Sequence, residues 1–147
     1  MASSRPKRPF RVFLDASVLF AGALSARGYS RDLIVLGASH RVEVVASATV
    51  LAEARRNLAI KVPRGLPLID VFERSMIMLT AEPPDELVRR VAEIVVTKDA
   101  PIVAGAMTAH ADFLATFDRK HLLRQAAVIQ ERFGVVVATP EEIVAAI

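Results

Sequence analysis

The chain contains no cysteine, and this absence excludes disulfide bonds, thiolate metal sites and cysteine nucleophiles. It has 3 histidines, none of them in an HxH or HExxH arrangement, so a zinc site is disfavoured. No run of about 18 or more apolar residues occurs, so we expect a cytoplasmic protein without a membrane span. Any metal bound by this chain would therefore rely on carboxylate oxygens, the ligands that suit Mg²⁺ and Mn²⁺.

The 147 residues, of which 53% are hydrophobic, are sufficient for one domain with a single core. No repeat, low-complexity tract or linker divides them. Arg5, Lys7 and Arg8 cluster beside two prolines, so we expect residues 1–9 to form a basic flexible tail and residues 10–147 to form one domain. The formal charge of +3 agrees with an anionic partner, and a phosphate-contacting arm is the alternative interpretation of the tail.

Apolar runs typical of buried strands alternate with segments of helical period. The strands are expected over residues 10–14, 42–47, 76–79, 112–117 and 135–138. The helices are expected from Ser17 onward, over 31–39 with Ser30 as the N-cap, over 48–61, 68–76 and 85–95, after Asp99, over 118–133, and after a capping box of Thr139 and Glu142. This alternation predicts an α/β protein, a three-layer α/β/α fold with a central, mainly parallel sheet.

Four acids stand where such a fold places functional groups, which is beyond the carboxyl ends of the strands. Asp15 follows the first strand and Asp118 follows the strand over 112–117. Asp99 precedes a buried helix, so its carboxylate can project toward the same edge. Glu53 lies beside the apolar stripe of the helix over 48–61, and Asn57 shares that flank one turn later.

Each acid also has a purely structural interpretation. The three aspartates can act as helix caps, and Glu53 can be an ordinary solvated helix residue. Taken together they favour a metal site, because carboxylates held close together repel one another unless a divalent cation neutralises them.

In these surroundings the residues resemble a PIN-domain ribonuclease, and most closely the toxin-like PIN proteins of prokaryotic toxin–antitoxin systems. The resemblance rests on FLDASVLFAG, on the glutamate in ATVLAEARRNL, on KDAPIVAGAMTAHADFLATFD and on the RKHL that follows. It covers most of the chain from Val12 onward. It implies a compact α/β/α fold, one or two Mg²⁺ or Mn²⁺ ions bound by four acids, and cleavage of RNA.

The acidic quartet of the family is matched in this sequence by Asp15, Glu53, Asp99 and Asp118. Ser17 matches a small polar residue and Thr116 a hydroxyl, and both would orient carboxylates or waters. Asp112 is a further acid that we interpret as structural. Lys120 stands where many members carry another acid, so the resemblance leaves the number of metal ions open.

The sequence therefore predicts a metal-dependent endoribonuclease, the toxin of a toxin–antitoxin pair, with an antitoxin protein and a second copy of the chain as partners. Asp15, Asp99 and Asp118 would hold the metal, and Glu53 would hold it through water or position the nucleophile. One alternative is a PIN-like module that binds RNA or protein without catalysis. Another is an aspartyl phosphotransfer domain, which Ser17 disfavours because phosphatases of that type carry a second aspartate there.

Overall fold

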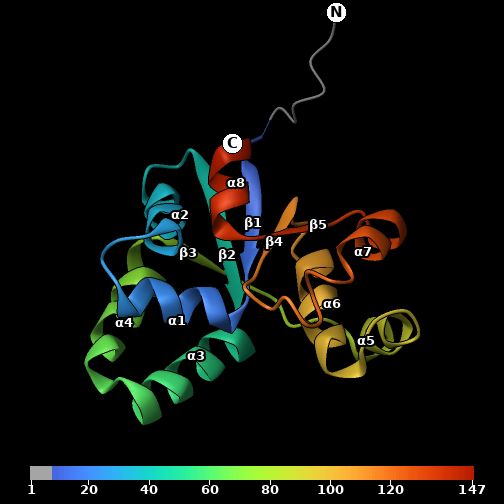
Figure 1. Cartoon of the computed structure of the whole chain (residues 1–147), viewed down its shortest axis with the longest axis horizontal. Helices are drawn as coiled ribbons and strands as arrows, with labels where there is room; N and C mark the ends of the chain where they lie inside the picture. Colours follow the sequence, from blue (N-terminus) through green and yellow to red (C-terminus); the bar gives the residue numbers. More distant parts are fainter. Residues whose placement is uncertain (1–7) are drawn as a thin grey trace, which may run out of the picture.

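A computed structural model describes residues 8–147, and residues 1–7 of the expected tail lie outside the described part of the chain. Five strands form one sheet in the order β3-β2-β1-β4-β5, and every neighbouring pair is parallel (Figure 1). The strands are β1 (Phe10–Leu14), β2 (Val42–Ser47), β3 (Ile77–Thr80), β4 (Phe113–Ala115) and β5 (Val136–Ala138). The predicted fold class is confirmed.

The α-helices follow the strands in alternation, as a parallel sheet requires. They are α1 (Ala16–Leu24), α2 (Tyr29–Ala38), α3 (Ala48–Lys61), α4 (Leu66–Ser75), α5 (Asp85–Ala92), α6 (Ala100–Thr108), α7 (Ala126–Phe133) and α8 (Pro140–Ala146). Two short 3-10 helices, η1 (Pro63–Gly65) and η2 (Thr97–Asp99), precede α4 and α6. None of the helices within residues 8–147 has the length and apolar character needed to cross a bilayer.

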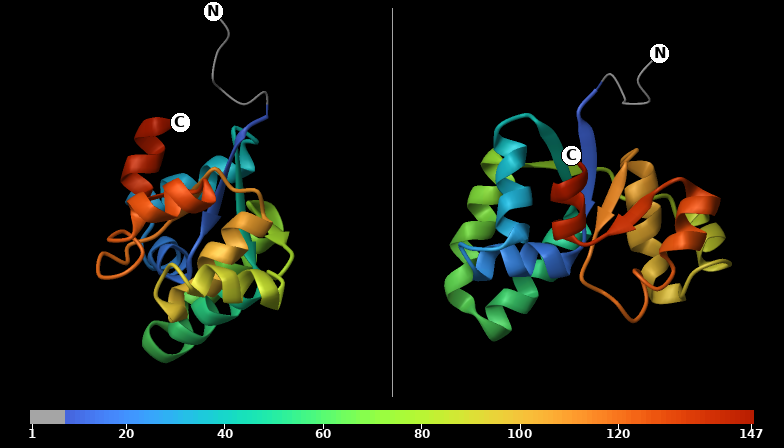
Figure 2. Two further views of the ribbon diagram at one scale, coloured as in Figure 1. Left: turned by 90° about the vertical axis from the view of Figure 1, so that its right-hand side faces the viewer. Right: turned by 45° about the horizontal axis from the view of Figure 1, so that its top comes forward.

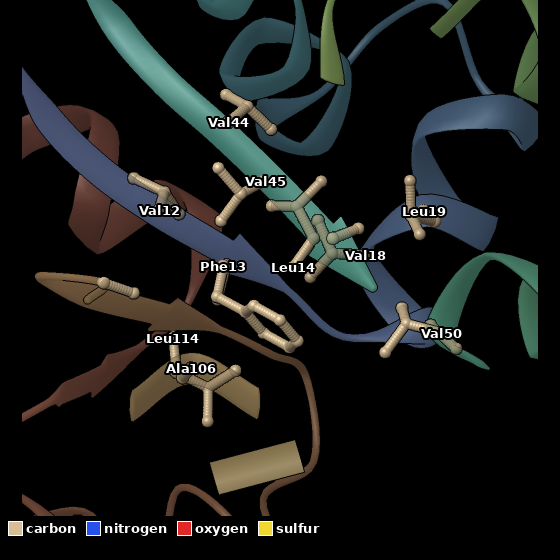
Figure 3. Close-up of a cluster of buried hydrophobic side chains, with 14 of the residues drawn as sticks. Val12, Phe13, Leu14, Val18, Leu19, Val44, Val45, Val50, Ala106 and Leu114 are labelled. Atoms are coloured by element: carbon tan, nitrogen blue, oxygen red, sulfur yellow. The ribbon is translucent and has the colours of Figure 1, made fainter. Parts of the chain in front are cut away.

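Helices cover both faces of the sheet, which is why β1 is apolar at every position except Arg11. On one face Gly37 of α2 lies so close to β2 that an added Cβ would sit 3.2 Å from the Cβ of Val44. On the other face an added Cβ at Gly105 of α6 would sit 3.0 Å from the Cζ of Phe13. Figure 3 shows Phe13 pointing toward Ala106 of α6, and Figure 2 shows α8 and α6 on opposite sides of the strands.

The order of the strands creates a switch point between β1 and β4. From β1 the chain builds the sheet in one direction through β2 and β3, and it then crosses through α5 and α6 to place β4 on the other side of β1. The chain leaves β1 toward β2 on one side of the sheet and leaves β4 toward β5 on the other side. The carboxyl ends of β1 and β4 therefore border a crevice. The segments that follow these two strands begin with Asp15 and Thr116.

Several boundaries of the expected secondary structure are wrong. Strand β4 is Phe113–Ala115 and not 112–117, so two loop residues separate it from Asp118. Helix α2 begins at Tyr29 with Gly28 at the N-cap, so Ser30 lies inside the first turn and does not cap it. Helix α5 ends at Ala92, before the expected end at residue 95, and the short 3-10 helix η2 precedes α6. The expected helix over 118–133 begins only at Ala126, after turns over residues 119–125.

Hydrogen-bonded turns take the place of the first part of the expected helix. The carboxylate of Asp118 accepts a hydrogen bond from the backbone N–H of His121 at 3.1 Å, which is the same i to i+3 capping contact that Asp15 makes with Val18. The carbonyl of Asp118 accepts from the N–H of Leu123 at 2.9 Å, so regular helix does not continue directly from this cap. The capping box of Thr139 and Glu142, in contrast, begins α8 as predicted.

Candidate metal centre

Asp15 is a buried carboxylate at the switch point, with an exposed fraction of 7%. It is the N-cap of α1, and its Oδ1 accepts a hydrogen bond from the N–H of Val18 at 3.2 Å. Burial raises the pKa of Asp15, and hydrogen bonds from Ser17, Thr116 and Val18 act in the opposite direction. These neutral donors satisfy part of the hydrogen-bonding capacity of the buried carboxylate.

Two hydroxyls connect Asp15 to the loop that follows β4. Ser17 Oγ donates to Asp15 Oδ1 at 2.5 Å and accepts from the N–H of Phe117 at 3.2 Å. Thr116 Oγ1 donates to Asp15 Oδ2 and accepts from the N–H of Asp118 at 3.0 Å. Each hydroxyl therefore binds one carboxylate oxygen and one backbone N–H, and together they fix the loop that carries Asp118.

Asp99 and Asp118 lie together with a histidine beside this network. Asp99, Asp118 and His121 each offer one potential ligand atom, and these atoms all lie within 4.8 Å of one another. Asp99 has an exposed fraction of 5%, and as the N-cap of α6 it makes no capping hydrogen bond with its side chain. Its carboxylate is therefore not used as a cap, which was the structural interpretation for this residue.

Electrostatics disfavour the charge on Asp99. Burial raises the pKa of Asp99, and the negative charge of Asp118 raises it further. Lys98, His121 and a hydrogen bond from Gln125 oppose these effects. Two carboxylates and an imidazole nitrogen this close together form a donor set that fits a divalent cation, which would remove the repulsion.

Gln125 holds the turn that carries His121. Its Nε2 donates to the carbonyl of His121 at 3.0 Å and lies 3.4 Å from Asp99 Oδ2, while its Oε1 accepts from the N–H of Val96 at 3.0 Å. Sequence reasoning did not identify Gln125 or His121 as members of the site. The spacing of three residues between Asp118 and His121 is the signal that could have indicated the histidine.

Glu53 and Asn57 are not part of this cluster. Glu53 is exposed on α3 and Asn57 is half-buried one turn later. Among residues 8–147, no carboxylate cluster within ligand distance includes Glu53 or Asp15. The structure thus brings together two of the four predicted acids and links a third to them through Thr116.

Asp112 lies at the opposite end of the same strand pair. Its Oδ2 accepts from the N–H of Arg11 at 2.8 Å and from the Nη1 of Arg8 at 3.0 Å. These contacts join the beginnings of β1 and β4, away from the switch point, so Asp112 has the structural role that was expected.

The family model of the PIN domain matches residues 11–120. The chain belongs to the PIN domain family. PIN domains are typically nucleases that use a divalent metal, so the family agrees with the donor set around Asp99 and Asp118. No curated protein matches this PIN domain.

Two solved structures share the fold of this PIN domain. The protein PAE2754 of Pyrobaculum aerophilum is 17% identical, with a TM-score of 0.62, and the similarity covers 93% of this chain and 94% of that one. VapC20 of Mycobacterium tuberculosis, described as a sarcin-ricin loop cleaving toxin, is 20% identical, with a TM-score of 0.54 over 74% of this chain and 91% of that one. At these identities the similarity shows the fold alone.

Replacing Thr116 by valine removes the hydroxyl that connects Asp15 and Asp118 but keeps the branched side chain. We expect the free energy of unfolding to fall by about 1–3 kcal/mol, because a buried carboxylate and a backbone N–H each lose a partner. Thr116→Ser keeps the hydroxyl and is the matched control. Urea unfolding measures the difference, and equal stability of the two variants would contradict the bridging role.

Asp99→Asn removes a charge that burial and Asp118 both disfavour. In EDTA at neutral pH we expect the Tm to rise by a few degrees. Because the pKa of Asp99 is raised, the folded protein binds the carboxyl proton of Asp99 more tightly than the unfolded chain does. The stability that this protonation contributes is fully present below the unfolded aspartate pKa of about 3.9. It is lost as the pH rises through the folded pKa of Asp99.

The Tm advantage of Asp99→Asn over the wild type should therefore grow over that pH interval and vanish below it. Thermal unfolding across pH measures this dependence. Asp70→Asn is the control, because Asp70 forms only an exposed ion pair with Arg55 and should change Tm little. A lower Tm for Asp99→Asn than for the wild type at neutral pH would show that Asp118 and burial do not strain this carboxylate.

Proposed function

We propose that this PIN domain is a Mg²⁺- or Mn²⁺-dependent endoribonuclease that hydrolyses phosphodiester bonds. The observation that carries the proposal is the convergence of Asp99, Asp118 and His121 donor atoms within 4.8 Å, beside the buried Asp15. This cluster lies at the switch point of a parallel sheet, where α/β proteins bind their ligands.

In this proposal each of these residues has a separate role. Asp15, Asp99 and Asp118 hold the cation, which when bound would supply Lewis-acid stabilisation of the charge on the phosphate. Ser17 and Thr116 keep the carboxylate of Asp15 in place through the hydrogen bonds described above.

In this proposal Glu53, the fourth acid of the family pattern, does not contact the cation directly. Because its side chain is exposed on α3, it can contact the cation through water or orient the attacking water when RNA is bound. Asn57, one turn further on the same helix, is proposed to position Glu53.

The charge of the protein supports a polyanionic substrate. The formal net charge is +3 and the pI is about 9.8, although the site itself gathers negative carboxylates. The remaining surface is therefore more positive than the net value indicates, and it would attract RNA toward the site.

Asp118→Asn should lower the rate of Mn²⁺-dependent cleavage of defined RNAs by about a hundredfold or more, because the charge that would hold the cation is lost. The measurement is a gel-based cleavage assay with Mg²⁺, Mn²⁺ or EDTA, and EDTA should abolish cleavage by the wild type. Asp112→Asn is a matched control, because Asp112 contacts Arg8 and Arg11 at the other end of the strands.

Wild-type activity in Asp118→Asn would show that the assignment of this residue is wrong. Metal titration separates the enzyme from the alternative of a non-catalytic binding module. Mn²⁺ should raise the Tm of the wild type and leave that of Asp118→Asn nearly unchanged, since only a bound ligand stabilises the folded state. A module that lacks the metal site would show no such difference.

We further propose that the protein is the toxin of a toxin–antitoxin pair, acts as a homodimer and takes an RNA substrate and an antitoxin. The likeness in fold to VapC20, described as a toxin that cleaves the sarcin-ricin loop, supports this role. A short open reading frame for a DNA-binding protein is then expected beside the gene. Its product should form a complex with this chain in size-exclusion chromatography and suppress cleavage, whereas a chain that cleaves RNA equally well with that product would not be its toxin.

A further inference from the structure

A hollow of about 340 Å³ lies next to the proposed catalytic site and is lined by residues of the α1–α2 loop, the loop after β4 and the start of α8. Its position is fixed by Phe117 and Arg119, which line it and flank Asp118 in the sequence. Its volume lies in the range of pockets that bind small molecules. Nothing in the proposed chemistry at Asp15, Asp99 and Asp118 uses this hollow.

Two aromatic side chains in the wall of the hollow are unusually exposed. Tyr29 is 46% exposed and Phe117 is 44% exposed, although burial of such rings is favourable. Among residues 8–147 the ring pair in contact is Phe10 with Phe113, so Tyr29 and Phe117 are not packed against each other. Each ring therefore has exposed surface in the wall of the hollow that a ligand can contact.

The polar groups of the hollow suit a nucleotide. Arg27 and Arg119 are exposed cations that can contact phosphates, and Glu141 can accept hydrogen bonds from the N–H groups of a base. Ser30 also lines the hollow, with an exposed fraction of 5%, and within the described residues its Oγ has no hydrogen-bond partner. A buried hydroxyl without a partner is costly, and a ligand that reaches it would satisfy it.

The rim of the hollow is held in place by the chain itself. Ser25 Oγ donates to the carbonyl of Arg27 at 2.8 Å and accepts from its N–H at 3.2 Å. Arg31 Nε donates to the carbonyl of Gly22 at 2.7 Å and so joins the start of α2 to α1. A preformed pocket of this kind binds with little ordering of the protein.

We infer that this hollow is a subsite that stacks one unpaired base of single-stranded RNA on Tyr29 and Phe117, with Arg27 and Arg119 contacting the adjacent phosphates. Aromatic stacking combined with cations along the backbone is how proteins hold single-stranded nucleic acids. The base lies within a few nucleotides of the bond that is cut, because α1 separates Asp15 from Leu24 at the hollow by about 13 Å, at 1.5 Å per residue. This inference rests on the proposed RNA substrate, but its test does not require cleavage.

The sequence provides a direct reporter for this subsite. Tyr29 is the only tyrosine and the chain has no tryptophan, so the fluorescence of the protein comes from Tyr29. In EDTA and at low salt, a short single-stranded RNA should quench this fluorescence in a saturable way. An abasic oligonucleotide of the same length and charge should quench it far less, because it has no base to stack.

Variants test the two rings separately. Phe117→Ala should weaken RNA binding about tenfold, and Leu79→Ala, which shortens an exposed apolar side chain on β3, should not. Labelled-RNA anisotropy should show that Tyr29→Phe binds as the wild type does and that Tyr29→Leu binds more weakly. This pair keeps the test informative if Phe117→Ala does not fold.

The outcomes separate this subsite from the proposed nuclease activity. Quenching by RNA without any metal-dependent cleavage would leave the subsite in place and refute the nuclease. Cleavage without quenching would refute the subsite. Equal quenching by the abasic oligonucleotide, or equal binding by Tyr29→Phe and Tyr29→Leu, would also overturn it and leave the hollow to another partner such as a protein.

Discussion

The structure around the site depends on one constraint, which is that the buried carboxylate of Asp15 must be satisfied. Its oxygens receive hydrogen bonds from Val18 in α1 and from the hydroxyls of Ser17 and Thr116. Because both hydroxyls also accept N–H groups of the loop after β4, the same contacts determine where Asp118 lies. The hydrogen bonds that Asp15 requires therefore determine the position of Asp118.

Strand order makes these contacts possible. β1 and β4 are neighbours in the sheet although about a hundred residues of chain separate them, so residues that follow the two strands meet at one edge. The N–H of Asp15 donates to the carbonyl of Ala115 at 3.1 Å and extends the pairing beyond the last strand residue. Helix α6 then brings Asp99 to this edge from the other side of the sheet, through the contact between Gly105 and Phe13. The site is therefore assembled from three separate segments by packing of the sheet.

Much of this arrangement could be predicted from the sequence, because apolar runs ending in an aspartate locate strand ends directly. Asp15 and Asp118 were found in this way, and Asp99 was found as the acid that precedes a buried apolar helix. The turns over 119–125 could not be predicted, since Leu122 and Leu123 fit a helical pattern. Gln125 was missed because its contacts with His121, Asp99 and Val96 depend on how these turns fold. Glu53 matched the family pattern, but its side chain is exposed and, in the described part of the chain, it lies outside the cluster of Asp99, Asp118 and His121.

Asp112 differs from the acids of the site in the charge of its partners. The acid lies at one end of the β1–β4 pair and takes its positive partner, Arg8, from within the chain. At the other end Asp15 receives neutral donors, and Asp99 faces the like charge of Asp118. An arginine placed beside Asp99 and Asp118 would relieve the repulsion between their charges, but it would also close the site to any cation from solution. At the end with Asp112 the charge is neutralised within the chain. At the end with Asp99 and Asp118 the repulsion lowers stability but leaves carboxylate oxygens free for a ligand.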